Sequence, residues 1–421
     1  MSIYDYLGSE LYSGKPSVEP QDNDIPIITI DGVLPTAKGE GDVNVVLAYK
    51  SLTDSFSSYA TVKVQGDSST TYPKKNFTVK LYSNTSRSKK LKKQFRDWDK
   101  ARNKFVLKAN WIDHSHARNI VNARLWTQIM KSRSDFASLP ETLTAGNMAI
   151  DGFPVKVYNN GVYMGLYTWN LPKDSMYGLD DDIVTNAIVQ GNSSYSGSIL
   201  WRSSTMDGKW TDELHDTMPL VITNGFNALL DFVYTSSDAD FVANFSTYFD
   251  KQSIIDQYIF LYAGCIVDNI GKNQTFFTYN GFYYYGGMYD MDGTWGLPPW
   301  HVGTTWKASD TAFQAGYTAI TDGDGVTTNL LYERVGSLFA SDIVSRYEEL
   351  RASVLSEDNI NAEFERFMSN IPPHVYAEDY ASTTGGGNFT GIPLVTTNNI
   401  QQIRQFVVDR LAYVDSQIIT S

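Results

Sequence analysis

The sequence predicts an α+β fold of two lobes, in which a β-rich lobe over residues 25–170 precedes a mostly helical lobe over residues 171–421. Two observations support this division. Short apolar segments separated by Gly, Asn and Pro turns fill the first part, whereas apolar residues at helical spacing dominate the C-terminal part. The break Asn170-Leu171-Pro172-Lys173 separates these patterns, and the polar residues 1–24 form an N-terminal arm ahead of both.

The first lobe is expected to be built mainly from short strands. A hairpin is expected near its end, because Asn159-Asn160-Gly161 supplies residues that tolerate positive φ between two aromatic and β-branched segments. The predicted strands are Ile25–Ile30, Val43–Ala48, Ala60–Val64, one within Tyr72–Leu81, Phe105–Ala109, Pro154–Tyr158 and Tyr163–Trp169.

One helix is expected in this lobe, over Ser115–Ser132, with Ser115 as its N-cap. Arg118 falls in the first turn, where a cation is poorly placed relative to the helix dipole, so a specific partner is expected for it. Asp113 is the nearest candidate. The strongly basic segment Ser86–Lys104 is expected to be a solvated loop with a short helix.

The second lobe combines strand-like pieces within Thr185–Trp201 with a series of helices. Ser253–Val267 is apolar nearly all round, which predicts the central helix of this lobe. The stretch after Gly296, up to Gly325, reads as a long loop, and Ala381–Phe389 reads as a flexible connection. The other expected helices are Leu220–Val233, Leu330–Phe339, Ser341–Leu355, Ile360–Ile371 and Ile400–Ser416.

Composition limits the classes of function. The 421 residues carry a formal net charge of −13, which argues against a nucleic-acid-binding protein. We see neither a long apolar run nor a basic-then-apolar start, so we expect no membrane segment and no signal peptide, and synthesis in the cytoplasm. Cys265 is the only cysteine, and the histidines show no zinc-ligand spacing.

A second hairpin is expected near the middle of the second lobe. Thr275–Tyr279 and Phe282–Tyr285 are aromatic and β-prone, and Asn280-Gly281 lies between them as a two-residue turn. Asp268 and Asn273 come just before the first strand, and two further aspartates follow the second strand. Since a hairpin brings its open ends together, these side chains are expected to share one small volume.

The two aspartates after this hairpin are Asp290 and Asp292, so three carboxylates and one amide are expected to meet. Like charges at short distance need a compensating cation, and hard oxygen ligands suit Mg²⁺ or Mn²⁺. In protein kinases a catalytic Asp is followed five residues later by a metal-binding Asn, then by a hairpin and a second metal-binding Asp. Asp268 and Asn273 have that spacing, although an acidic surface turn is the alternative interpretation.

A turn of small residues in the first lobe is the second candidate binding element. Gly66, Ser68 and Ser69 follow an apolar strand, and their backbone N–H groups could approach phosphate oxygens. Lys74 or Lys75 on the next strand would neutralise such phosphates. The alternative interpretation is a surface hairpin with solvated lysines.

Taken together, these stretches resemble the CotH family of atypical spore-coat protein kinases. The resemblance covers about residues 25–300 and is carried by motifs that occur in the family's order. They are Val64-Gln65-Gly66-Asp67-Ser68-Ser69 with Tyr72-Pro73-Lys74-Lys75, Leu107–Asp113 with Arg118-Asn119, Asn160–Tyr167, Asp268 with Asn273, and Asp290–Gly296.

The resemblance implies a two-lobed protein-kinase-like fold with ATP and Mg²⁺ or Mn²⁺ in the cleft. It implies that Asp268 is catalytic and accepts or orients the proton of the substrate hydroxyl. The remaining implied roles are phosphate contacts by Gly66, Ser68, Ser69 and Lys74 or Lys75, metal ligation by Asn273 and Asp290 or Asp292, and a structural brace made by Asp113 and Arg118.

Two departures from the family pattern keep two functions open. Gln65 stands where the family usually has Arg, and Asn170-Leu171-Pro172 stands where it commonly has Glu. The first function is an active kinase that phosphorylates Ser or Thr of a protein. The second is a structural component of a phage tail, spore coat or other surface assembly, with an assembly partner and a homo-oligomer contact through the arm. A carbohydrate site is a third reading, suggested only by tryptophans such as Trp201, Trp210 and Trp300.

Overall fold

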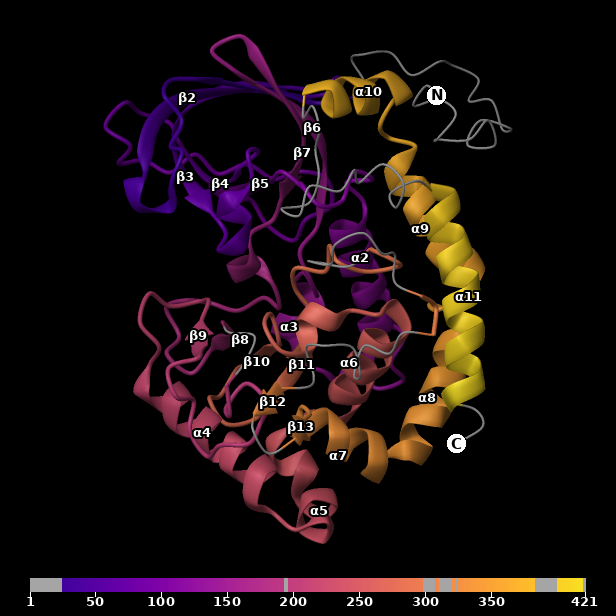
Figure 1. The fold of residues 1–421 in the computed structure, drawn as a ribbon. Helices are drawn as coiled ribbons and strands as arrows, with labels where there is room; N and C mark the ends of the chain where they lie inside the picture. Colours follow the sequence, from indigo (N-terminus) through magenta and orange to yellow (C-terminus); the bar gives the residue numbers. More distant parts are fainter. Residues whose placement is uncertain are drawn as a thin grey trace.

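The computed structural model describes residues 25–192, 196–297, 307–309, 320–322, 325–382 and 400–418. The expected arm over residues 1–24 and the expected connection over residues 383–389 lie outside the described residues. A β-rich N-terminal part lies above a mostly helical C-terminal part in Figure 1. The predicted order of a β-rich and a helical part is therefore confirmed.

The N-terminal sheet closes into a barrel, which the sequence did not predict. Its strands follow the order β1-β2-β3-β4-β5-β7-β6, and a parallel pairing of β1 with β6 completes the circle. In β2, Val45, Leu47 and Tyr49 are buried in the barrel core and alternate with more exposed neighbours, as one wall of a barrel requires. The strands are β1 Ile27–Asp31, β2 Val43–Lys50, β3 Ser55–Gln65, β4 Asn76–Tyr82, β5 Lys104–Lys108, β6 Gly152–Asn159 and β7 Val162–Asn170.

The hairpin between β6 and β7 forms where the sequence predicted it. Asn160 and Gly161 adopt φ values of 48° and 77°, the left-handed conformation that a tight Asn-Gly turn requires. The hairpin also places β7 beside β5, so its last residue, Asn170, pairs with Val106. Because the two strands are antiparallel, the last residue of β5, Lys108, pairs with Thr168 rather than with the end of β7.

The basic segment Ser86–Lys104 differs from its prediction, because its described residues form turns and isolated bridges rather than a helix. Phe95 and Trp98 are 6% and 2% exposed and belong to the barrel core. Both rings contact Phe105 of β5. Burying two large aromatic side chains stabilises the closed barrel, so this basic run is anchored rather than solvated.

Helix α2 (Arg118–Lys131) joins the core of the helical part. Its buried apolar residues cluster with those of α6 (Lys251–Gly264) and α9 (Glu357–Met368), against which it packs. The prediction of Ser115 as N-cap is wrong. The backbone N–H of Arg118 donates instead to Asp113, at 2.8 Å, and the Ser115 hydroxyl donates to the same carboxylate, at 2.6 Å.

Helix α6 is the central helix of the C-terminal part, as predicted, with buried residues around its circumference. The Asp250 side chain caps its first turn, and it ends at Gly264 because Cys265 takes a left-handed φ of 52°. It packs against β11 of a sheet with the order β11-β10-β8-β9. The strands of this sheet are β8 Ala187–Gly191, β9 Trp210–Asp212, β10 Thr275–Thr278 and β11 Tyr285–Gly287.

The predicted two-residue turn between β10 and β11 is wrong. Tyr285 pairs with Phe277, so the connection is a longer loop. The Asn280 side chain organises this loop, since its Oδ1 accepts hydrogen bonds from the backbone of Phe282 and Tyr283, at 3.1 and 2.9 Å. The open end of the hairpin is unaffected, because Thr275 still pairs with Gly287 there.

Three α-helices were not predicted. They are the short α3 (Glu141–Ala145), α5 (Asp238–Tyr248), which is capped by Ser237, and α10 (Pro373–Ser382), which packs on β7 of the barrel. Within the described residues, no helix has the length and apolarity needed to span a bilayer. The remaining α-helices are α4 Leu220–Thr235, α7 Leu330–Leu338, α8 Ala340–Arg351 and α11 Ile400–Ile418.

Candidate active site

The acidic residues meet at the open end of the β10–β11 hairpin. Asp268 lies in the short 3-10 helix that follows α6, and its Oδ2 accepts a hydrogen bond from Asn273 Nδ2 at 2.8 Å. Asp290 and Asp292 follow β11, and both approach the ammonium group of Lys108. Because Thr275–Gly287 is the last pair of the ladder, both chain ends are held at the same place. We call Asp268, Asn273, Asp290 and Asp292 the acidic cluster.

The carboxylates of this cluster influence one another electrostatically. Burial, and then the charge of Asp290, raises the pKa of Asp268 from 3.8 to about 7. Burial also raises the pKa of Asp292, to about 6, against the opposing effect of Lys108. Burial acts in the same direction on Asp290, but the Lys108 ammonium outweighs it and lowers the pKa of Asp290. Burial thus opposes ionisation at all three carboxyl groups, and only at Asp290 does the Lys108 ammonium outweigh it.

Lys108 is the residue of this site that sequence reasoning missed. It is the last residue of β5, its side chain is 15% exposed, and its Nζ lies 2.5 Å from Asp290 Oδ1 and 3.4 Å from Asp292 Oδ2. Burial alone would lower the pKa of Lys108, but the two carboxylates raise it above its ordinary value. The available signal was a single charged residue at the end of an apolar strand.

The small-residue turn lies beside the acidic cluster. Gly66 follows β3 with a φ of 114°, and a Cβ there would come within 2.1 Å of Ser69 Oγ, so the turn needs glycine. Asp67 forms an ion pair with Lys272, at 3.3 Å. Since Lys272 lies between Asp268 and Asn273 in the chain, this pair links the turn to the cluster. Ser68 begins a 3-10 turn that continues to Thr71.

Lys74 and Lys75 have partners elsewhere. Lys74 is buried, and its Nζ donates to the carbonyl of Leu166 at 2.5 Å and to Asp379 of α10 at 2.8 Å. Lys75 Nζ donates to two carbonyls of its own turn, those of Thr70 and Tyr72, at 2.7 and 2.6 Å. In this conformation both lysines point to partners other than the four members of the acidic cluster.

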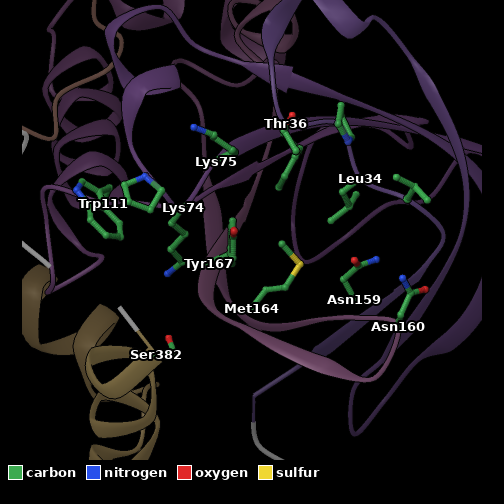
Figure 2. Close-up of a pocket in the computed structure, with 14 residues that line it drawn as sticks. Leu34, Thr36, Lys74, Lys75, Trp111, Asn159, Asn160, Met164, Tyr167 and Ser382 are labelled. Atoms are coloured by element: carbon green, nitrogen blue, oxygen red, sulfur yellow. The ribbon is translucent and has the colours of Figure 1, made fainter. Parts of the chain in front are cut away.

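Both lysines line an open hollow of about 750 Å³ at the barrel, shown in Figure 2. Its wall includes Leu34, Met164 and Tyr167, and Trp111 closes one side. The Trp111 ring stacks on Tyr72, with ring centroids 6.0 Å apart. Burial, and then the charge of Asp292, raises the pKa of the Tyr72 hydroxyl. The hollow and the acidic cluster are thus neighbouring but separate features.

The expected brace forms between Asp113 and Arg118. Both side chains are buried, and Arg118 Nη1 donates to Asp113 Oδ1 at 2.7 Å. Arg118 also donates to the Thr294 carbonyl at 2.8 Å and to Gln402 Oε1 of α11 at 2.9 Å. The pair therefore connects α2 with the segment that carries Asp292 and with the C-terminal helix.

Neighbouring residues of α2 complete this attachment. Asn119 Oδ1 accepts a hydrogen bond from the backbone N–H of Met291, at 3.1 Å, and Asn122 Nδ2 donates to the Met291 carbonyl at 2.9 Å. Met291 lies between Asp290 and Asp292, so both aspartates are positioned through α2. A left-handed φ of 55° at Asp290 shows how sharply the chain turns there.

The donor set is suited to a hard cation, but its geometry is not that of a preformed cage. Carboxylate and amide oxygens are the ligands that Mg²⁺ and Mn²⁺ prefer. Over the described part of the chain, no group of three His, Cys, Asp or Glu residues is arranged to hold one ion. Burial, followed by the neighbouring carboxylates, raises the pKa values of Asp268 and Asp292, and a bound cation would favour their ionised forms. The types of donor atom therefore suit Mg²⁺ or Mn²⁺, whereas the protein groups do not form a complete ligand shell, so other oxygen donors would have to complete it.

The two departures from the family pattern differ in burial, since Gln65 is half-buried whereas Asn170 is buried. Gln65 Oε1 and Asn170 Oδ1 are buried oxygens that lack a hydrogen-bond partner among the described residues. Of the tryptophans that suggested a carbohydrate site, Trp201 and Trp210 are buried and belong to the core. Trp300 lies outside the described residues.

Comparison with known proteins identifies one family for most of the chain. A family model described as CotH kinase protein matches residues 62–414, which is most of the chain. No curated protein matches the chain. The match covers the end of β3 and the small-residue turn as well as the acidic cluster and most of α11. The chain belongs to the CotH kinase protein family.

Proposed function

We propose that this chain is a kinase that transfers the γ-phosphate of ATP to Ser or Thr hydroxyls of a protein substrate. The observation that carries the proposal is the convergence of Asp268, Asn273, Asp290 and Asp292 at one end of a hairpin. The Gly66–Ser69 turn faces this cluster through the Asp67–Lys272 ion pair. A triphosphate between the turn and the cluster would meet backbone N–H groups on one side and cation ligands on the other.

Asp268 is the proposed catalytic residue. At neutral pH the protonated and ionised forms of a carboxyl group whose pKa is about 7 have similar free energies, so the group can accept a proton and release it again. The substrate hydroxyl oxygen would bond to the γ-phosphorus while the bond to the β–γ bridging oxygen breaks. The hydroxyl proton would pass to Asp268, and the nucleoside diphosphate would leave. The Asn273 amide holds Asp268 in place for this step.

Asn273, Asp290 and Asp292 are the proposed ligands of Mg²⁺ or Mn²⁺. When bound, the ion supplies positive charge that stabilises the phosphate oxygens during transfer. The protein's own contribution is positioning, since α2 fixes Met291 between the two aspartates. We extend the proposal to a kinase-like arrangement, with the barrel as N-lobe and the α6-centred part as C-lobe. In it Gly66, Ser68 and Ser69 contact phosphate.

Lys74 and Lys75 enter the proposal only with a change of partners. Lys74 would have to leave Asp379, which is costly because both groups are buried. Lys75 is held only by carbonyls of its own turn, so an anionic ligand could attract it more readily. Of the two, Lys75 is therefore the better candidate for a phosphate contact.

The second candidate function is a structural one, in a phage tail, spore coat or other surface assembly. It is favoured by the Lys108 ion pairs, which already compensate part of the charge of Asp290 and Asp292. These ion pairs connect β5 of the barrel with the segment after β11 in the helical part, and they need no bound ligand. Both functions are compatible with the fold, so ligand binding must separate them.

Thermal unfolding with and without ATP and Mg²⁺ or Mn²⁺ tests the proposal. A ligand that binds only the native state at a hundred times its Kd adds about 2.7 kcal/mol to the free energy of unfolding. We expect a cation-dependent rise in Tm that Asp290→Asn or Asp292→Asn abolishes. Asp342→Asn, at an exposed ion pair with Lys251, should keep the rise and is the matched control.

Catalysis is tested separately from binding. Asp268→Asn should retain the ligand-dependent rise in Tm and lose phosphate transfer to protein Ser or Thr by about 10²- to 10⁴-fold. No rise in Tm at millimolar ATP with either cation would contradict the kinase assignment. The structural role would then be the remaining candidate, and the next measurement would be the protein's assembly state.

A further inference from the structure

Lys108 lies where a cation bound by Asp290 and Asp292 would have to lie. Its Nζ is 2.5 Å from Asp290 Oδ1 and 3.4 Å from Asp292 Oδ2, so a single ammonium spans the two carboxylates. A magnesium ion binds oxygen at about 2.1 Å and repels a neighbouring ammonium. The same two oxygens cannot serve both cations at these distances.

We propose that Lys108 acts as an internal competitor of the divalent cation, so that the metal enters only when a polyphosphate draws the ammonium away from Asp290 and Asp292. This inference rests on the proposed function and adds regulation to the same site. A lysine has a flexible four-carbon stem, which lets its ammonium move by several ångströms while the backbone of β5 stays in place. The phosphate oxygens would offer the displaced ammonium a new partner.

The charges around Lys108 support an exchange rather than a fixed bridge. Asp268 adds a third carboxylate to the cluster, and its own contact is with the neutral amide of Asn273. Lys272 and Lys173 also act electrostatically on Asp290, but they pair with Asp67 and Glu213. Lys108 is in direct contact with both Asp290 and Asp292, so a divalent ion that binds these carboxylates must first displace it.

A partner for the displaced lysine lies on the same side of the cluster. Gln65, directly before the Gly66–Ser69 turn, pairs with Asn76, whose side chain accepts a hydrogen bond from the backbone N–H of Ala109. An anion held by the turn would therefore lie near the end of β5 that carries Lys108. A metal alone brings no such anion and leaves Lys108 without compensation. The structure therefore favours entry of the metal together with a polyphosphate.

Titration with Mn²⁺ in the absence of nucleotide tests this inference, with free Mn²⁺ followed by its electron paramagnetic resonance signal. Lys108→Met and Lys108→Gln both remove the ammonium, and each should lower the Kd for Mn²⁺ at least tenfold relative to the wild type. Lys108→Arg keeps a cation and should bind Mn²⁺ as weakly as the wild type. Lys104→Met, on the same strand and paired with Asp174, should also behave as the wild type.

A second arm identifies the site and separates this inference from the proposed function. Asp290→Asn in the Lys108→Met background should abolish the gained affinity. If ATP with Mn²⁺ stabilises the wild type but the lysine variants bind Mn²⁺ no more tightly, the competition is refuted and the kinase proposal stands. If the lysine variants gain Mn²⁺ binding but ATP never stabilises any form, the competition stands and the kinase proposal fails. Absence of Mn²⁺ binding in every variant, together with no stabilisation of any form by ATP and Mn²⁺, overturns both.

Discussion

Replacing Asp268 with asparagine should stabilise the ligand-free protein at alkaline pH. The buried Asp268 carboxyl has its pKa raised from 3.8 to about 7, first by burial and then by Asp290. In the unfolded chain the carboxyl ionises near its ordinary value, so the native state binds the proton more tightly. Asparagine keeps the oxygen that accepts the hydrogen bond from Asn273 and removes the charge.

The sign and the size follow from proton linkage. Below pH 3.8 the carboxyl is protonated in both states and costs nothing. Between pH 3.8 and about 7 the unfolded state loses the proton while the native state keeps it, so the free energy of unfolding falls over this range and levels off above it. Each pKa unit corresponds to about 1.4 kcal/mol, so the full difference reaches about 4 kcal/mol at pH 8 and above. The gain from Asp268→Asn should therefore grow from near zero at pH 4 to about 2–4 kcal/mol at pH 8.

Urea unfolding of both proteins at pH 4, 6 and 8, without metal or nucleotide, measures this gap. Comparison at each pH removes the contribution of the other carboxyl groups. Asp216→Asn, at an exposed position, is the control and should change the free energy of unfolding by less than about 0.5 kcal/mol at every pH. A gap that stays constant between pH 4 and 8, or an asparagine variant that is less stable at pH 8, would refute the reasoning.

The other stability predictions concern close packing and buried charge, and urea unfolding at neutral pH checks both. Gly225→Ala should destabilise by about 3 kcal/mol, because its Cβ would fall 1.7 Å from the carbonyl oxygen of Gly281. Gly39→Ala, whose Cβ meets nothing within 4 Å, should be close to neutral, and equal costs would contradict the packing argument. Lys74→Met should cost about 3–5 kcal/mol by leaving the buried Asp379 without its cation. Adding Asp379→Asn to that variant should cost less than it does alone; full additivity would show that the pair does not interact.

The sequence determined the order of the elements and the location of the acidic cluster. Short apolar segments between turn residues predicted the strands of the first part, and a segment that is apolar nearly all round predicted α6 as a central helix. Asp268, Asn273, Asp290 and Asp292 were predictable as neighbours because a hairpin joins them, which is a local constraint. The ion pair between Asp113 and Arg118 was predictable for the same reason, since the two residues are close together in the sequence.

Tertiary structure decided which charged groups meet across the fold. Lys108 reaches Asp290 only because the barrel closes and presents the end of β5 to the helical part. Lys74 forms an ion pair with Asp379, which lies in α10, a helix that the sequence pattern did not predict. Such pairs join residues far apart in sequence, and ion pairing has no sequence period that would reveal them. Local patterns thus gave the strands, the helices and the cluster, whereas burial and long-range charge decided which lysine faces the carboxylates.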